Sequence, residues 1–513
     1  MSAKAKSDTA EQFVGSVFKF SISTVVSFIF TGAALILSSV FFAGESDKAL
    51  YGEIEQFIGT SNLIMTLTIL GLDQSFIRFF NEPPGRTTSG GLFRLCLYIS
   101  ASTLVVAGLV CSLFFAGPLH QALNFNLIGT EAIPLMFLNA LFWMVVRYFT
   151  VLYRMEQRVR IYTMTTILMN FSYKLFYLVG LVFPSPMVGM VACSLISWGA
   201  LAVFCIFTRR RALVFRKSDL AGPAVRVVLP YGLALAPTAI MVTLNNFFGG
   251  LYLSFMDEAA RGIFRYSISL SNIVTMVQGG FAAFWGAYMF ANYKTQQQRI
   301  KRVHGYLYLV ILVFFALLVA FEDVIFWVLS SFKDAQPIFP LVMLSAVFTI
   351  LCETTVYGNA IARRPIFDTI GIAISMIVNI VLCVLLTPTL GMLGAAIAIA
   401  VADLLMYLFR TLTAQRYYVS INSVPKTIIA VEVAIALALA GTLFTYDFLP
   451  KLLCSAAAIV IYCLMYRAEL VRLWHLAIGM LNHLFRRSGG GGPGTSGGHP
   501  DTNSNGWQYH KGD

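Results

Sequence analysis

About fourteen stretches of 20 or more mostly apolar residues follow one another from Phe13 to about Tyr466, separated by short polar gaps. A hydrocarbon layer roughly 30 Å thick needs about 20 helical residues to cross it. The segments Ile161–Phe183 and Ile366–Leu386 are long enough. A membrane strand would need only about ten alternating residues, a pattern that this chain lacks. The sequence therefore predicts an all-α polytopic membrane protein with about 14 transmembrane helices.

Several apolar segments carry polar residues at helical spacing. In the first segment they lie three or four residues apart, at Gln12, Ser16, Lys19, Ser23, Ser27 and Thr31. This spacing places them on one helical face, which lipid cannot satisfy, so the face is expected to line a water-filled cavity. Helix packing through hydroxyl groups, with Lys19 reaching toward the interface, is the alternative.

Similar polar faces are predicted in the second, eighth and tenth segments. They comprise Glu55, Asn62, Thr66 and Asp73; Arg261, Arg265, Ser269, Asn272 and Thr275; and Ser345, Thr349, Glu353 and Tyr357. With the first segment and the fifth, these faces would enclose one hydrated path. The cavity-lining residues expected from them are Ser16, Ser23, Ser27, Asn62, Asn170, Tyr177, Ser269, Asn272 and Tyr357.

Basic residues also lie deep within the predicted membrane segments. A lone cation at the bilayer centre costs about 2.5–3.5 kcal/mol on insertion scales, so each needs a partner or a ligand. We expect Lys19, Arg147, Lys174 and Arg265 to form a cationic cavity that binds an anionic substrate such as a phosphate or pyrophosphate. Structural ion pairing is the alternative. The carboxylates available for pairing, or for coupling to an ion, are Asp73, Glu353, Asp403 and Glu432.

Composition and charge agree with a membrane location. The 513 residues are 58% hydrophobic and only 12% charged, too little polar surface for a soluble protein. The net charge of +12 requires no nucleic acid, because Lys and Arg collect in every second gap, as in Arg209–Arg211 and Lys294–Arg302. Basic gaps mark the cytoplasmic side, so both termini are predicted to be cytoplasmic.

The chain lacks the common signatures of soluble chemistry. Eight Cys are scattered without a CxxC pair, six His are far apart, and no GxxxxGK[ST] loop is present. We expect no metal, no cofactor and no enzymatic activity. The longest predicted external gap, near Gly117–Glu131, is too short for a soluble catalytic domain, which argues against a membrane glycan polymerase or ligase.

Short motifs along most of Gln12–Arg467 resemble one family. They are Tyr51-Gly52 with GLDQSFIRFFNE (Gly71–Glu82), YRMEQRVRIYT (Tyr153–Thr163), LPYGLALAP (Leu229–Pro237), RGIFRYS (Arg261–Ser267), GFAAFWGAY (Gly280–Tyr288) and NIVLCVLLTPTLGMLGAAIAIAVAD (Asn379–Asp403). In order and spacing they are similar to oligosaccharide flippases of the polysaccharide-transporter type, in the multidrug/oligosaccharidyl-lipid/polysaccharide exporter superfamily. Asn245-Asn246 departs from that pattern, since relatives often carry a charged pair there.

The resemblance implies two six-helix lobes around a central cavity, with alternating access to the two sides of the membrane. The lobes would be residues 1–217 and 218–417, with two added helices in 418–466. The basic stretch 467–487 is predicted to be a juxtamembrane helix, and the Gly-rich segment 488–513 a disordered cytoplasmic tail. In the last segment of the resemblance, Gly391 and Gly394 suit a tight turn, and Gly394, Ala395 and Ala396 permit close helix packing.

The function implied is a flippase that moves an undecaprenyl-pyrophosphate-linked oligosaccharide across the bacterial plasma (inner) membrane for surface polysaccharide biosynthesis. Expected partners are that lipid-linked oligosaccharide and membrane lipids, with a polysaccharide polymerase and glycosyltransferases acting nearby. A multidrug and toxin extrusion-type antiporter is the first alternative, and it would favour a cavity dominated by carboxylates. A membrane glycan polymerase or ligase is the second.

Overall fold

The structure is a computed structural model, and it describes residues 26, 28–85, 87–156, 158–214 and 222–475. Within these ranges the regular structure is helical and contains no strand, as the sequence predicts. The chain forms two compact units, Met1–Tyr466 and Arg467–Asp513. In the second unit residues 467–475 are helical. The rest of the predicted basic helix and the predicted tail lie outside the described residues.

The helices of the first unit follow one another with short connections. In the first half they are Phe28–Phe41, α2 (Glu45–Ile69), α3 (Leu72–Phe79), α4 (Ser89–Phe114), α5 (Ala116–Ala122), α6 (Ala132–Met155), α7 (Val159–Lys174), η1 (Phe176–Val182), α8 (Pro186–Thr208) and η2 (Arg210–Leu213). The second half comprises α9 (Gly222–Ser254), α10 (Glu258–Asn292), α11 (Gln297–Ala320), α12 (Glu322–Val328), η4 (Ser330–Ile338), α13 (Phe339–Cys352), α14 (Tyr357–Ile361), α15 (Ile366–Leu390), α16 (Met392–Gln415), α17 (Val424–Leu443) and α18 (Phe448–Met465).

Eleven helical segments in the described ranges are long and apolar enough to cross a membrane. The sequence predicts about 14. Outside the set of eleven lie the shorter apolar helix Phe28–Phe41 and the long helices α2 and α10. The last two carry charged residues that are buried in the protein, among them Glu55 and Arg265. Burying these charges against other helices keeps them out of lipid.

Local chemistry sets several helix boundaries. The Thr88 hydroxyl accepts a hydrogen bond from the Gly91 amide at 3.1 Å and begins α4. At the start of α10, Asp257 accepts hydrogen bonds from the Ala259 and Ala260 amides at 2.9 and 3.0 Å. The turn between α15 and α16 has Gly391 at φ +56°. A Cβ at Gly394 would lie 2.6 Å from the Leu386 carbonyl, so the predicted turn and close packing are both confirmed.

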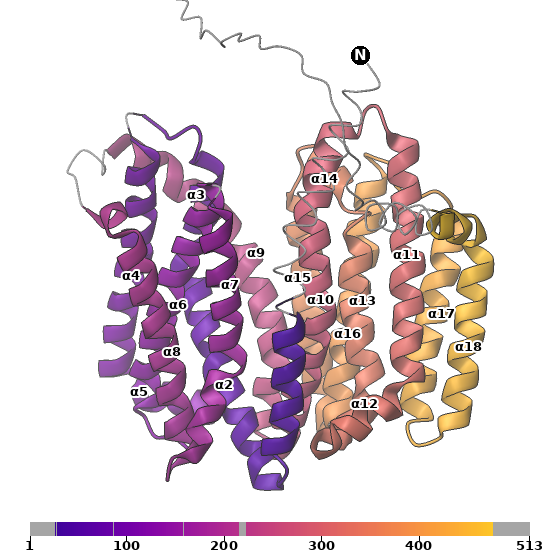
Figure 1. The fold of residues 1–513 in the computed structure, drawn as a ribbon, viewed down its shortest axis with the longest axis horizontal. Helices are drawn as coiled ribbons and strands as arrows, with labels where there is room; N and C mark the ends of the chain where they lie inside the picture. Colours follow the sequence, from indigo (N-terminus) through magenta and orange to yellow (C-terminus); the bar gives the residue numbers. More distant parts are fainter. Residues whose placement is uncertain (1–25, 27, 86, 157, 215–221, 476–513) are drawn as a thin grey trace, which may run out of the picture. The chain divides into compact units, whose positions relative to one another are not determined.

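The helices pack as two groups with α9 between them. Figure 1 shows α2 to α8 on one side and α10 to α18 on the other. The core of the first group contains large buried side chains, including Phe93, Tyr148, Phe149 and Trp198. Helix α9 contacts α2 and α3 as well as α10 and α15. Helix α17 packs against α11 and α13, and α18 packs against α11. Helix α9 thus joins the two groups.

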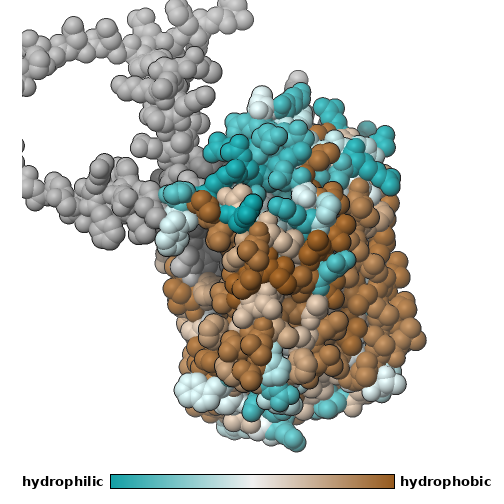
Figure 2. Space-filling view, turned by 90° about the vertical axis from the view of Figure 1, so that its right-hand side faces the viewer, coloured by the Kyte–Doolittle hydropathy of each residue, from teal (hydrophilic) through white to brown (hydrophobic). Residues whose placement is uncertain are grey.

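Large apolar side chains cover the outside of the helices. Among the most exposed are Leu113, Phe207, Trp327 and Leu443, each at least 74% exposed. On the face drawn in Figure 2, hydrophobic side chains occupy a broad band, and hydrophilic side chains gather at its two ends. Exposing so large an apolar surface to water would be unfavourable, but the hydrocarbon layer of a membrane solvates it. The chain is therefore a multi-pass membrane protein.

Candidate functional site

A polar cavity of about 320 Å³ lies between helices of the two groups. We name it the interlobe cavity. Its walls come from α2, α9 and α10, and its lining residues are Glu55, Gly59, Asn62, Val242, Thr243, Asn246, Phe247, Arg265, Ile268, Ser269 and Asn272. Four residues expected from the sequence to line or charge a cavity are thus brought together: Asn62, Arg265, Ser269 and Asn272.

Arg265 is built into the wall of this cavity. It is only 8% exposed, and its guanidinium lies over the Phe247 ring, 4.9 Å from the ring centroid. The Nη2 atom donates a hydrogen bond to the Phe247 carbonyl at 3.0 Å. Gly250 leaves room for the side chain, since a Cβ there would lie 2.2 Å from Nε. The Arg265 guanidinium is therefore held in one position. The Glu55 carboxylate, 6% exposed, lines the same cavity.

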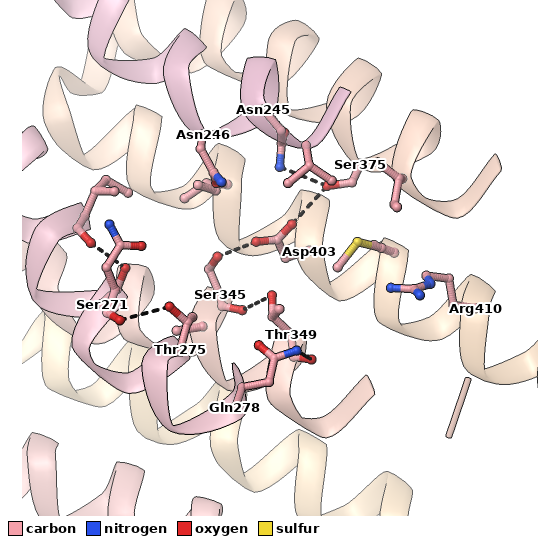
Figure 3. Close-up of a pocket in the computed structure, with 17 residues that line it drawn as sticks. Asn245, Asn246, Ser271, Thr275, Gln278, Ser345, Thr349, Ser375, Asp403 and Arg410 are labelled. Atoms are coloured by element: carbon pink, nitrogen blue, oxygen red, sulfur yellow. Dashed lines mark hydrogen bonds between the residues drawn. The ribbon is translucent and has the colours of Figure 1, made fainter. Parts of the chain in front are cut away.

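A second cavity, of about 270 Å³, adjoins the interlobe cavity. We name it the second-lobe cavity, and its residues come from α9, α10, α13, α15 and α16. The two cavities share the lining residues Val242, Asn246, Ile268 and Asn272. Figure 3 shows the second-lobe cavity, with the Asn246 side chain extending into it from α9. Polar groups therefore continue from between the two helix groups into the second group.

Asp403 is the carboxylate of the second-lobe cavity. It is 6% exposed and accepts hydrogen bonds from the Ser345 hydroxyl and, at 2.9 Å, from the Ser375 hydroxyl (Figure 3). Ser375 in turn accepts a hydrogen bond from the Asn245 amide at 3.3 Å. Two helices, α13 and α15, thus hold this carboxylate in place through neutral hydroxyl donors, which makes it suited to bind a proton or a small cation.

Other predicted site residues have internal partners. Arg147 forms an ion pair with Asp73, with 2.6 Å between Nη2 and Oδ2, and neither residue lines the two cavities. Glu353 accepts hydrogen bonds from the Tyr357 hydroxyl at 2.9 Å and the Gln278 amide at 3.1 Å. The structure therefore realises, for Arg147, the ion pairing that the sequence offered as the alternative to a free cavity cation.

The remaining predicted residues are dispersed or undescribed. The Asn170 amide donates to the Thr166 carbonyl at 2.8 Å, Tyr177 is buried, and Glu432 is exposed on α17. Lys174 ends α7, but its side chain is not described. The first-segment residues Ser16, Lys19, Ser23 and Ser27 lie outside the described residues.

Sequence reasoning missed part of the lining, including Thr243, Asn246 and Ser375. The adjacent Asn245 and Asn246 were the available signal, since two carboxamides in an apolar membrane segment need polar surroundings. Asn245 turns to α15, where its side-chain and backbone oxygens accept hydrogen bonds from the Asn379 amide at 2.9 Å. Asn245 lines only the second-lobe cavity, whereas Asn246 lines both cavities.

At the end of the helices where α2 begins and α9 ends, α2 and α10 are fastened together. Glu53 and Arg261 are both 0% exposed and pair with 3.5 Å between Oε2 and Nη2. Glu53 also accepts a hydrogen bond from the Leu127 amide at 2.8 Å. Beside them, the Tyr266 and Phe332 rings stack with centroids 3.9 Å apart. Glu53 and Arg261 precede the cavity-lining residues Glu55 and Arg265 in α2 and α10. We name this set of contacts the α2–α10 closure.

No protein-family model matches the sequence, and no curated protein matches it. Solved structures do share its fold. A lipid II flippase, MurJ, in an inward closed conformation, superposes with a TM-score of 0.63 at 13% identity, over 90% of this chain and 99% of that chain. The MATE multidrug transporter DinF-BH gives a TM-score of 0.53 at 15% identity, over 78% of this chain and 95% of that chain.

A further MATE structure gives a TM-score of 0.55 at 14% identity, over 78% of this chain and 95% of that chain. At these identities the likeness shows the fold alone. The chain therefore has the helical membrane fold shared by a lipid II flippase and by MATE transporters.

Proposed function

We propose that this protein is a flippase that moves an undecaprenyl-pyrophosphate-linked oligosaccharide across the bacterial plasma membrane by alternating access. The observation that supports it most is the interlobe cavity, because helices from both groups line it with polar side chains inside a membrane protein. Such a lining is costly unless it meets water or a polar substrate. A movement of the two groups would change access to this cavity.

The comparisons favour a lipid substrate over a soluble one. The MurJ structure is that of a lipid II flippase and aligns with 90% of this chain, against 78% for the two MATE structures. A lipid-linked substrate also suits the cavity, since its polar head could occupy the wet interior while the isoprenoid stays in the bilayer. The resemblance to oligosaccharide flippases supplies the proposed glycan and the place in surface polysaccharide biosynthesis.

Arg265 is the cation that we assign first to the pyrophosphate. Its guanidinium offers paired N–H donors, which match phosphate oxygens. Lys19 and Lys174 stay in the proposal as further cations, and Arg147 would contribute only if it released Asp73. Asp403 is the proposed coupling carboxylate, because it opens on a cavity that adjoins the substrate site. Protonation or cation binding there would alter the charge beside the substrate.

The proposed location is the bacterial inner membrane with both termini in the cytoplasm, alongside a polysaccharide polymerase and glycosyltransferases. Cysteine labelling tests the orientation. With an impermeant thiol reagent on intact cells, Met256→Cys should react and Arg302→Cys should not; both sites are exposed. The opposite result would reverse the topology.

Reconstitution tests the function itself. Purified protein in vesicles should move a fluorescent undecaprenyl-pyrophosphate oligosaccharide between leaflets faster than protein-free vesicles do. Arg265→Gln should slow this movement about tenfold or more, because a charge-assisted bond to phosphate is worth about 1.5–3 kcal/mol. Arg265→Lys should recover only part of the rate, since Lys cannot form the forked contact. Absence of movement by the wild type would refute the proposal.

A multidrug antiporter is the second candidate, and the carboxylates of the two cavities favour it. Glu55 lines the interlobe cavity and Asp403 the adjoining one, where an organic cation could contact them. Vesicles loaded with a cationic dye decide between the candidates. An antiporter should move the dye when a proton or sodium gradient is applied, and Asp403→Asn should abolish this movement. If the same protein does not move the lipid-linked glycan, the antiporter function is established.

A further inference from the structure

Three carboxamides face the interlobe cavity from three different helices. They are Asn62 on α2, Asn246 on α9 and Asn272 on α10. Asn246 and Asn272 are exposed, and Asn62 is partly exposed. Their side chains donate no hydrogen bond to, and accept none from, other residues in the described ranges. The backbone carbonyls of Asn62 and Asn272 are bonded within their helices, by Thr66 and Thr275, so only the amide groups are available.

The charges of this cavity are few and lie back in its wall. Of its lining residues only Arg265 is basic and only Glu55 is acidic, and both are buried, at 8% and 6% exposed. The described lining therefore carries no net formal charge. The more open surface consists of neutral groups, the three carboxamides with Thr243 and the apolar Val242, which is 43% exposed.

Each carboxamide offers two donor hydrogens and one acceptor oxygen. An anion such as pyrophosphate accepts hydrogen bonds but has few to give, so it would leave the three amide oxygens unmatched. An organic cation would leave the amide hydrogens unmatched. A sugar matches both, because every hydroxyl is a donor and an acceptor, and an acetamido group repeats the pairing of the carboxamide itself.

We propose that Asn62, Asn246 and Asn272 bind the neutral sugar next to the pyrophosphate, and that they set the specificity of transport for the glycan. The inference rests on the proposed function, whose phosphate contact is Arg265. Because Asn246 and Asn272 also line the second-lobe cavity, sugar bound to them lies at the boundary with the cavity that Asp403 lines.

Paired substrates test the inference with the full-length protein in vesicles. One is undecaprenyl pyrophosphate carrying an N-acetylhexosamine disaccharide, and the other is undecaprenyl pyrophosphate without sugar. The triple variant Asn62→Ala, Asn246→Ala, Asn272→Ala should lose about tenfold or more of the glycosylated rate, as expected for several lost hydrogen bonds. The fold reduction in transport rate of the triple variant should be at least about fivefold smaller for the lipid without sugar. Arg265→Gln should slow both lipids.

Asn292→Ala is the matched control. This amide lies on α10, as Asn272 does, but it donates to the Tyr288 carbonyl of its own helix at 3.0 Å and lines neither cavity. It should leave the ratio of the two rates unchanged. Equal loss for the two lipids in the triple variant, or no loss for either, would overturn the inference while leaving the flippase intact.

Binding separates this inference from failure of the proposed function. If the wild type moves neither lipid, thermal stabilisation by soluble methyl N-acetylglucosaminide and by sodium pyrophosphate is compared. Stabilisation by the sugar that disappears in the triple variant and persists in Asn292→Ala would support the sugar site without flipping. No stabilisation of the wild type by the sugar, or stabilisation that the triple variant retains, would overturn it.

Discussion

Arg147 and Asp73 show how a deep cation can serve the structure. Their side chains are 43% and 4% exposed, so the carboxylate is the more deeply buried member. We predict that Arg147→Gln lowers the free energy of unfolding by about 1–3 kcal/mol, because it leaves that carboxylate without its cation. Membrane abundance and melting temperature in detergent measure the effect. The double variant Arg147→Gln, Asp73→Asn should be more stable than Arg147→Gln alone, because no carboxylate is left unpaired. If it is not, the loss of the ion pair does not explain the lower stability of Arg147→Gln.

Glu322, at the start of α12, is expected to make the stability of the folded protein depend on pH. It is 0% exposed, and its carboxylate oxygens have no hydrogen-bond partner in the described part of the chain. Burial raises the pKa of Glu322 to about 8 from 4.5, although Lys451 acts to lower it. The folded protein therefore retains a proton that the unfolded chain releases, and its stability falls as the pH rises between these two values.

The slope should approach about 1.4 kcal/mol per pH unit within that window. Glu322→Gln keeps the neutral form and should remove this slope, so that the variant exceeds the wild type in melting temperature near pH 8. Melting curves from pH 5 to 9 provide the measurement. Identical pH profiles for the two proteins would contradict it.

At the scale of helices, two glycines decide how closely α2 and α10 approach. A Cβ at Gly262 would lie 2.0 Å from the Lys48 carbonyl oxygen, and one at Gly52 would lie 2.8 Å from the Gly262 nitrogen. We predict that Gly262→Ala costs about 1–3 kcal/mol of stability, because backbone atoms of α2 must move away. Thermal unfolding monitored by size-exclusion chromatography measures this cost.

Gly32→Ala is the control for that substitution. Gly32 lies in the helix Phe28–Phe41, and a Cβ there would meet nothing within 4 Å in the described structure. Alanine should be neutral or slightly stabilising at that position, since it favours helix over glycine. Equal losses at Gly32 and Gly262 would mean that the α2–α10 contact is not the cause.

At the scale of the whole molecule, the proposed alternating access would require the α2–α10 closure to open. Lys48 on α2 and Asp334 on η4 span this end, with 2.6 Å between Nζ and Oδ2. We predict that Lys48→Cys, Asp334→Cys loses transport when a short methanethiosulfonate cross-linker joins the two thiols, because the closure then cannot open. Reduction should restore transport. Each single-cysteine variant, treated alike, should remain active, and full activity of the cross-linked protein would show that this end does not move.

The sequence alone determined the all-α, multi-pass membrane class and the α15–α16 turn. Those features are local. In lipid each helix must satisfy its own backbone hydrogen bonds, and the bilayer thickness sets its length. Gly391 and Gly394 likewise act through neighbouring backbone. Helical spacing also placed Asn62, Arg265, Ser269 and Asn272 on polar faces before any packing was known.

Only the tertiary structure decided which polar faces meet. Asp73 lies 74 residues from Arg147 in the chain, and periodicity cannot show that α3 places this carboxylate beside α6. Asn246 lines both cavities, while its neighbour Asn245 lines only the second-lobe cavity and hydrogen-bonds to Asn379 on α15, a difference set by the rotation of α9 between its neighbours. Side-chain period fixes a face of a helix, but the partner of that face depends on how the helices pack, which involves residues far apart in sequence.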